Sequence, residues 1–141
     1  MKKEIGRIDK ADFPLLNLFD IDVKIDTGAY TSSIHCINLK EENGLLKCIF
    51  LDKDHPDYHE KEFIFDTYDK KVVKSSNGIA ETRFRIKSKI VLFNKTYDIF
   101  LTLSDRGEMR FPVLLGRHFL KNKFIVDPGK SYLSYKQKQT I

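Results

Sequence analysis

The sequence predicts an all-β domain, built as a small barrel or sandwich with one short helix. Three observations lead to this prediction: short segments alternate apolar and polar residues, turn residues separate those segments, and phenylalanine and β-branched residues are frequent. The chain has 141 residues, the length of one domain. We therefore expect residues 1–141 to form a single unit with its own hydrophobic core.

Composition narrows the class of protein further. Apolar residues make up 41% of the chain, which excludes a disordered tail, and the net charge of +5 is typical of ordinary solubility. No segment has the length and hydropathy of a signal peptide or a membrane span. The two cysteines, Cys36 and Cys48, are too few for a disulfide framework. We expect a soluble, cytoplasmic protein with reduced thiols and no membrane partner.

The first half of the chain contains four expected strands, because apolar residues alternate in each and polar or proline-containing stretches separate them. These strands are residues 4–8, 15–25, 31–39 and 45–51. Gly44 supplies the turn between the last two. The stretch "DKADFP" joins the first two strands, and the polar, proline-containing residues 52–61 are expected to form a surface loop.

The second half begins with a clear alternation over residues 82–92, and a second alternation follows over residues 97–103. The short turn between them predicts a hairpin. Residues 113–115 form an apolar strand that stops at Gly116, and "RHFLKN" after it predicts the one short helix. The segment 123–135 is expected to form two closing strands around a turn at Pro128 and Gly129.

The stretch "KIDTGAYTSS" is unusual because a strand ends on an acid, a hydroxyl and the two smallest residues. Two carboxylates that share one proton can activate a water molecule and protonate a carbonyl oxygen, which hydrolyses an amide. The chain has one Asp-Thr-Gly, so the second Asp26 would come from another copy across a two-fold axis. The simpler interpretation is a turn in which Asp26 accepts backbone hydrogen bonds.

Five segments, taken in order, resemble one bacterial branch of the retropepsin-like aspartic proteases. This branch is the RimB-type group, also labelled putative ATP-dependent zinc protease, and it is associated with RimK-like ATP-grasp ligases. The matching segments are "IGR" at 5–7, "KIDTGAYTSSIH" at 24–35, "VVKSSNG" at 72–78, "RFPVLLGRHFL" at 110–120 and "FIVDPGKSYL" at 124–133. The resemblance implies a small closed barrel of the retropepsin-like type.

The resemblance also assigns site residues. It implies that Asp26, Thr27 and Gly28 are catalytic, and that Ala29 lies beside the substrate. A flap tip is expected at Ser75, Ser76, Asn77 and Gly78, because Asn-Gly favours a hairpin turn. Three arginines are candidates for binding acidic substrate groups, since guanidinium binds carboxylates in a fork: Arg83, Arg110 and Arg117. Arg85 is expected on a solvated strand face.

The predicted function is therefore an aspartic peptidase that works as a homodimer, in which the two Asp26 side chains hold the attacking water. The resemblance implies a peptide or poly-glutamate substrate and an ATP-grasp ligase as a partner. Two alternatives stay open: a monomeric, non-catalytic binding module with the protease fold, and a zinc-dependent protease.

We expect no cofactor, since Pro56 interrupts the His55–His59 spacing that a helical metal site would need. Nucleic-acid binding is also not expected, because acids are scattered among the bases.

Overall fold

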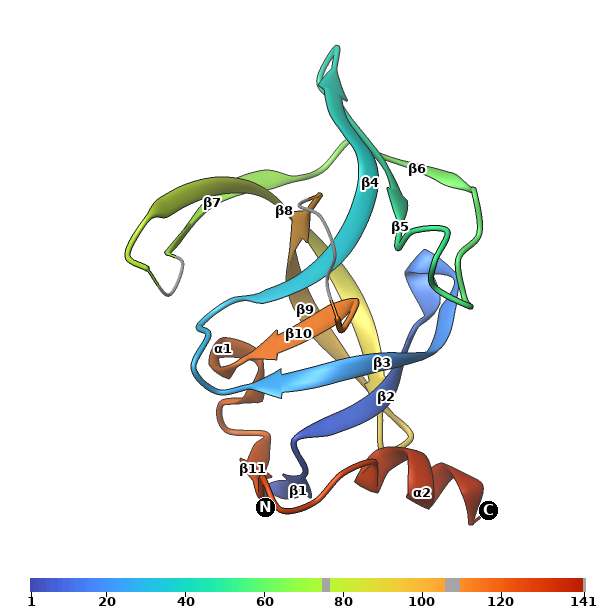
Figure 1. The fold of residues 1–141 in the computed structure, drawn as a ribbon, viewed down its shortest axis with the longest axis vertical. Helices are drawn as coiled ribbons and strands as arrows, with labels where there is room; N and C mark the ends of the chain where they lie inside the picture. Colours follow the sequence, from blue (N-terminus) through green and yellow to red (C-terminus); the bar gives the residue numbers. More distant parts are fainter. Residues whose placement is uncertain (75–76, 106–109, 141) are drawn as a thin grey trace.

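The computed structural model describes residues 1–74, 77–105 and 110–140. Most of these residues lie in strands, as predicted (Figure 1). The strands are β1 (Lys3–Ile5), β2 (Ile8–Phe13), β3 (Leu18–Asp26), β4 (Ser32–Glu42), β5 (Leu45–Phe50), β6 (Glu62–Phe65), β7 (Asp69–Lys74), β8 (Ala80–Leu92), β9 (Lys95–Ser104), β10 (Val113–Gly116) and β11 (Phe124–Val126). The helices are a 3₁₀ turn, η1 (Pro14–Leu16), and two α-helices, α1 (Arg117–Leu120) and α2 (Leu133–Gln139).

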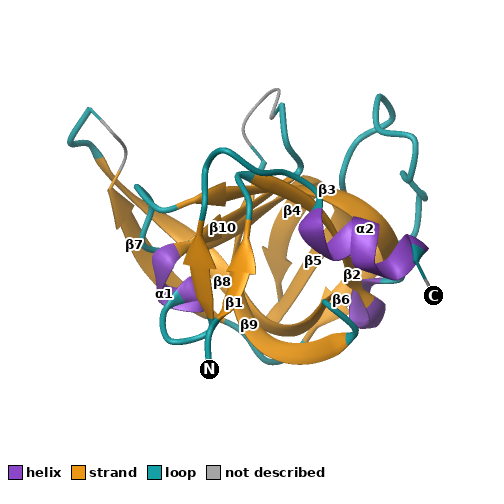
Figure 2. Ribbon diagram, turned by 90° about the horizontal axis from the view of Figure 1, so that it is seen from below, coloured by secondary structure: helices purple, strands orange, loops and turns teal. Residues whose placement is uncertain are grey.

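Six strands pair in a ring. The hydrogen-bonded order runs β10, β3, β2, β8, β9 and β4, and β4 pairs with β10 again. Figure 2 shows these strands curving around a common interior. Strands β5 and β6 extend the sheet beyond β4, β7 pairs with β8, and β1 forms a separate parallel pair with β11.

The interior of the ring is apolar because alternate residues of each strand point inward. In β3, Ile21, Val23 and Ile25 are buried while Lys24 is exposed. The same period buries Ile86, Ile90 and Leu92 in β8. Burying such side chains contributes about 1.5–3 kcal/mol each, so the sequence alternation fixes which face of each strand lies inside.

Several expected elements are confirmed. Strands β4 and β5 pair around the Gly44 turn, and β8 and β9 form the expected hairpin over the whole stretch from Arg85 to Thr102. Strand β10 ends at Gly116, and α1 begins at the next residue. Strands β7 and β8 also pair antiparallel, while residues 75 and 76 of the predicted flap tip lie outside the described residues.

Two expectations are wrong. Residues 9–13 were expected to connect two strands, but they form most of β2, because Ala11 and Phe13 alternate inward with the polar residues outside. The last strand of the chain is instead helix α2, so the structure has more than one α-helix. Tyr132 has a left-handed backbone (φ 57°), which ends the extended course of the chain.

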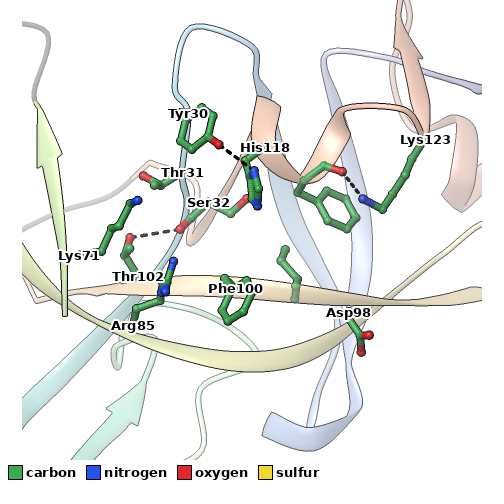
Figure 3. A pocket seen from close by; sticks show the side chains of 12 residues that line it. Tyr30, Thr31, Ser32, Lys71, Arg85, Asp98, Phe100, Thr102, His118 and Lys123 are labelled. Carbon is green, nitrogen blue, oxygen red and sulfur yellow. Dashed lines mark hydrogen bonds between the residues drawn. The ribbon is translucent and has the colours of Figure 1, made fainter. Parts of the chain in front are cut away.

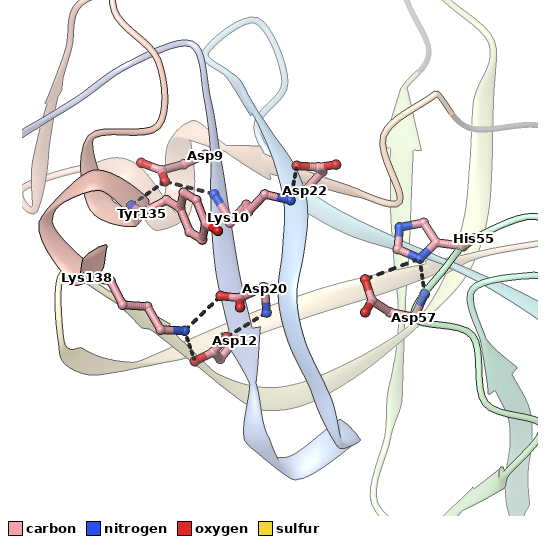
Figure 4. Close-up of polar contacts among 9 residues, drawn as sticks. All are labelled: Asp9, Lys10, Asp12, Asp20, Asp22, His55, Asp57, Tyr135 and Lys138. Carbon is pink, nitrogen blue, oxygen red and sulfur yellow. Dashed lines mark hydrogen bonds and ion pairs between the residues drawn. The ribbon is translucent and has the colours of Figure 1, made fainter. Parts of the chain in front are cut away.

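Helix α2 is held at its N-terminus by a buried acid on β2. The Asp9 carboxylate accepts hydrogen bonds from the backbone N–H groups of Ser134 (2.9 Å) and Tyr135 (3.1 Å) (Figure 4). Burial raises the pKa of Asp9, and these hydrogen bonds partly offset that effect. Farther along α2, Lys138 forms an ion pair with Asp20 at 2.8 Å. A distant acid therefore caps the helix, which explains why no local sequence signal predicted it.

No helix in the described part of the chain is long and apolar enough to cross a membrane.

Candidate functional site

The loop that follows β3 is built on the parallel pairing of β3 with β10. Leu115 pairs with Ile25 and Gly116 pairs with Asp26, so Asp26 is the last paired residue of its strand. The chain then turns, and the N–H of Ala29 donates to the carbonyl oxygen of Asp26 at 3.1 Å. This register places residues 26–29 directly beside the start of α1.

Gly116 allows the two chain segments to approach closely. A Cβ atom at this position would lie 2.5 Å from the carbonyl oxygen of Thr31 and 2.7 Å from that of Tyr30, distances that real side chains do not show. The Gly116 N–H donates to the hydroxyl of Ser32 at 3.0 Å, and the Thr102 hydroxyl donates to the carbonyl oxygen of Ser32 at 3.1 Å. The glycine therefore determines how close β10 lies to the loop.

Arg117, the first residue of α1, holds the loop from the other side. Its Nη1 lies 3.3 Å from the carbonyl oxygens of both Thr27 and Gly28, to which it donates. Its guanidinium also lies over the ring of Tyr30, 5.4 Å from the ring centroid. The Tyr30 hydroxyl in turn lies 3.0 Å from Nδ1 of His118. Arg117 is thus engaged with the backbone of the loop.

Asp26 itself is half-buried, while Thr27 and Gly28 are exposed. A Cβ at Gly28 would meet only Oδ1 of Asp26, at 3.5 Å, so the carboxylate lies beside this glycine. None of the five pockets found among the described residues is lined by Asp26.

A pocket of about 250 Å³, called pocket 1 below, lies next to this loop (Figure 3). Its walls come from the loop after β3, from α1 and its C-terminal turn, and from strands β7, β8 and β9. Four basic residues line it: Lys71, Arg85, His118 and Lys123. Figure 3 shows the nitrogen atoms of Lys71 and Arg85 on the side of the pocket that carries Tyr30 and Thr31.

Arg85 is held in place by two contacts. Its guanidinium donates to both carboxylate oxygens of Asp69, at 2.9 and 2.6 Å, and lies 4.5 Å from the centroid of the Phe100 ring. The Arg85 hydrogen bond lowers the pKa of Asp69, and the same bond raises the pKa of Arg85. Arg85 therefore forms a charge-paired wall of pocket 1, and its side chain is still 25% exposed.

The only acid that lines pocket 1 is Asp98, and it forms an ion pair with Lys89. The hydrogen bond from Lys89 lowers the pKa of Asp98. Two lysines remain. Lys71 has no ion pair among the described residues, and Lys123 donates to the carbonyl oxygen of Phe119 at 2.9 Å. With histidine neutral, the charges at pocket 1 therefore leave an excess of two positive groups.

Comparison with known proteins identifies the family. Residues 5–137 match the model of the RimB-like family, described as retropepsin-like aspartic endopeptidase RimB. The chain belongs to this family. The match covers the loop after β3, pocket 1, helix α1 and most of α2, and it confirms the resemblance found in the sequence.

The curated relatives are named as ligases, whereas the family description names an endopeptidase. A protein of Desulfotalea psychrophila is 37% identical over 134 residues, and one of Shewanella pealeana is 35% identical over 134 residues; each match covers 91% of this chain. Both are named probable alpha-L-glutamate ligase, as are two further relatives. The chain spans 28–29% of the length of these relatives.

These names overturn the prediction that this member of the RimB-like family is an aspartic peptidase. A ligase forms bonds that a hydrolase breaks, and all four relatives are named as ligases.

A solved structure shares the fold. The crystal structure of a Legionella pneumophila protein with unknown function superposes with a TM-score of 0.72, at 25% identity, over 95% of this chain and 99% of that chain. The retropepsin-like architecture of this family thus holds over almost the whole length of both proteins.

The remaining predicted residues lie in three places. Asn77 and Gly78 are exposed at the tip of the β7–β8 hairpin, whereas Ser75 and Ser76 lie outside the described residues. Arg83 is on the same face of that hairpin as Lys71, and its Nη2 lies 3.4 Å from the Glu81 carboxylate. Arg110 lines a different pocket, far along the chain from Lys71 and Arg85.

The residues that sequence reasoning missed are Lys71, Tyr30, His118 and Lys123. Tyr30 and His118 lie within the matching segments 24–35 and 110–120, whereas Lys71 and Lys123 lie outside all five segments, and pocket 1 brings the four residues together. As for metals, no group of three or more His, Cys, Asp or Glu side chains in the described ranges has an arrangement that could hold an ion.

Proposed function

We propose that this chain binds the acidic peptide of a glutamate-ligation system, and that pocket 1 holds glutamate carboxylates. Support comes from the two lysines left uncompensated there and from the names of the relatives. Carboxylates bind strongly to ammonium groups that are partly shielded from water. Lys71 and Lys123 approach the pocket from different elements, so one acidic chain can contact both.

The fixed groups around the lysines favour an extended acidic chain. Arg85 is already paired with Asp69, and therefore shapes the pocket with Phe100 and adds no net charge. Tyr30 and Thr31 place hydroxyl groups at the edge. In this proposal the lysine ammonium groups attract the carboxylates, and the hydroxyl groups at the edge form hydrogen bonds with the peptide. Ligand sites commonly combine a few charged and polar groups in this way.

The partners in this proposal follow from the relatives. They are more than three times as long as the matched segment, so the bond-forming chemistry would be supplied by an ATP-grasp type of ligase that works with this chain. We further propose that the strand ring is the closed barrel of the retropepsin type, and that two copies associate through the exposed loop at Thr27 and Gly28. Light scattering of the purified chain tests this association, and a strict monomer would contradict it.

The test of the binding function is a calorimetric titration with tetra-L-glutamate, and with tetra-L-glutamine as the uncharged control. We expect tetraglutamate to bind, with an affinity that falls as salt is added because the contacts are ionic. Tetraglutamine should bind at least about tenfold more weakly. Equal binding of the two peptides, or no binding of tetraglutamate at low salt, would refute the proposal.

A further inference from the structure

The second pocket, called pocket 2, is larger and carries charges of both signs. It has a volume of about 490 Å³ and is lined by residues of β4, of the 51–55 segment and of the stretch before β10. They are His35, Leu51, Asp52, Asp54, His55, Arg110 and Pro112. A volume of this size lies in the range of small-molecule sites. No residue of pocket 1 lines it.

The inner part of pocket 2 is a preformed pair of polar groups. Nε2 of His35 lies 3.0 Å from Oδ2 of Asp52, and the other carboxylate oxygen of Asp52 accepts the N–H of Asp54 at 2.9 Å. The His35 side chain is only 6% exposed, and its Nδ1 has no hydrogen-bond partner among the described residues. A buried polar atom without a partner is uncommon in proteins and is a reason to look for a ligand.

The outer part carries two charges that are not paired. Asp54 and Arg110 are both exposed, and in the described ranges neither takes part in an ion pair. His55 differs, because its Nδ1 accepts the N–H of Asp57 at 3.2 Å and lies 3.8 Å from that carboxylate (Figure 4). The rim of pocket 2 therefore offers one free anion and one free cation.

We infer that pocket 2 binds a free α-amino acid as its zwitterion. The guanidinium of Arg110 takes the α-carboxylate in a fork, and the carboxylate of Asp54 takes the α-ammonium group. His35, held by Asp52, lies at the inner wall, where the side chain of the amino acid would extend. Free glutamate is the amino acid that glutamate ligation consumes. The inference itself rests on the charges of pocket 2 and not on peptide binding in pocket 1.

The balance of charges excludes simpler ligands. A dicarboxylate without an ammonium group would meet only one unpaired cation, and it would be repelled by Asp54. A metal ion would need three or more suitable side chains, which the described residues do not bring together. The end of a growing peptide has a carboxylate but no free ammonium at its last residue, so it also lacks a partner for Asp54. A free amino acid satisfies both rim charges at once.

The experiment is a titration of the ¹⁵N-labelled chain with L-glutamate, followed by amide NMR shifts. We expect saturable shifts at residues 35, 51–55, 110 and 111, and not at Lys71 or Lys123. N-acetyl-L-glutamate, which lacks the ammonium group, should bind at least about tenfold more weakly. Asp54→Asn should weaken L-glutamate binding to a similar extent. Lys53→Gln is the matched control, because Lys53 is an exposed neighbour that does not line pocket 2, and it should leave the affinity unchanged.

Three results would overturn the inference: no saturable shift with L-glutamate, equal binding of the acetylated compound, or an unchanged affinity in Asp54→Asn. Since Asp54 is exposed, its substitution is not expected to unfold the chain. The readout is separate from that of pocket 1, since the amide shifts with L-glutamate report on the residues that line pocket 2, whereas pocket 1 is tested by calorimetry with tetraglutamate. Failure at one pocket therefore says nothing against the other.

Discussion

The hydroxyl of Tyr30 lies 3.0 Å from Nδ1 of His118, and this contact joins the loop after β3 to helix α1. Arg117 strengthens the same connection, because its guanidinium lies over the Tyr30 ring and donates to two loop carbonyl oxygens. Tyr30 and His118 also line pocket 1. The loop that sequence reasoning assigned to catalysis thus forms one wall of the basic pocket.

The first prediction concerns that contact. Tyr30→Phe removes the hydroxyl but keeps the ring under Arg117, so the unfolding free energy should fall by no more than about 1 kcal/mol. Tetraglutamate affinity at pocket 1 should fall a few-fold because His118 is no longer held. Urea unfolding and calorimetry measure the two effects. Tyr132→Phe is the control, and an equal loss of affinity there would argue against a specific role for Tyr30.

The second prediction concerns the close approach at Gly116. Gly116→Ala places a methyl group against the backbone of Tyr30 and Thr31, so β10 and the loop have to separate. Overpacking of this kind costs about 1–3 kcal/mol of unfolding free energy. Gly28→Ala is the matched control, because its methyl group would make only an ordinary contact with Asp26. Thermal unfolding compares the two variants, and similar stabilities would show that the approach is not required.

The third prediction is a pH dependence. The hydrogen bond from Arg85 lowers the pKa of Asp69 below its ordinary value of 3.8. The pair therefore stabilises the fold above about pH 4, and this contribution is lost as the pH falls through the lowered pKa. The stability difference between the wild type and Asp69→Asn should be largest near neutral pH and shrink in acid. Urea unfolding across that range measures it, with Asp66→Asn as the control; a difference that does not change with pH would contradict the pairing.

The fourth prediction concerns the remote cap of α2. Asp9→Ala leaves the N–H groups of Ser134 and Tyr135 without their acceptor, and the unfolding free energy should fall by about 1–3 kcal/mol. Amide hydrogen exchange should increase first in residues 133–139. Asp57→Ala removes an exposed acid and is the control. Unchanged exchange in α2 of the Asp9→Ala variant would show that another contact holds the helix.

Sequence patterns predicted the strands well because burial imposes their period. The alternation in β8 and β9 identified both strands and their pairing, and the glycine at position 116 marked the end of β10. Helix α2 could not be predicted in the same way, because its cap is an acid more than a hundred residues away. The segment 123–135 was expected to form two strands, but a tertiary contact holds its last residues in α2.

The site was only partly predictable for a related reason. The motif around Asp26 lies in the loop that borders pocket 1, and Arg117, which was predicted to bind acidic substrate groups, instead donates to two carbonyl oxygens of that loop. Lys71 was not found, because a lysine in an alternating strand is equally typical of a solvated face. Whether Lys71 faces a binding site depends on which elements lie opposite β7. The tertiary fold determines this, and the local sequence does not.

The most direct test of the account compares tetraglutamate binding by Lys71→Gln and Lys74→Gln. Both substitutions remove one positive charge from β7, but Lys71 lines pocket 1 and Lys74 does not. We predict that Lys71→Gln lowers the affinity by about tenfold, while Lys74→Gln changes it by less than about twofold. Equal effects of the two substitutions, or cleavage of the peptide by the wild-type chain during the titration, would contradict the account.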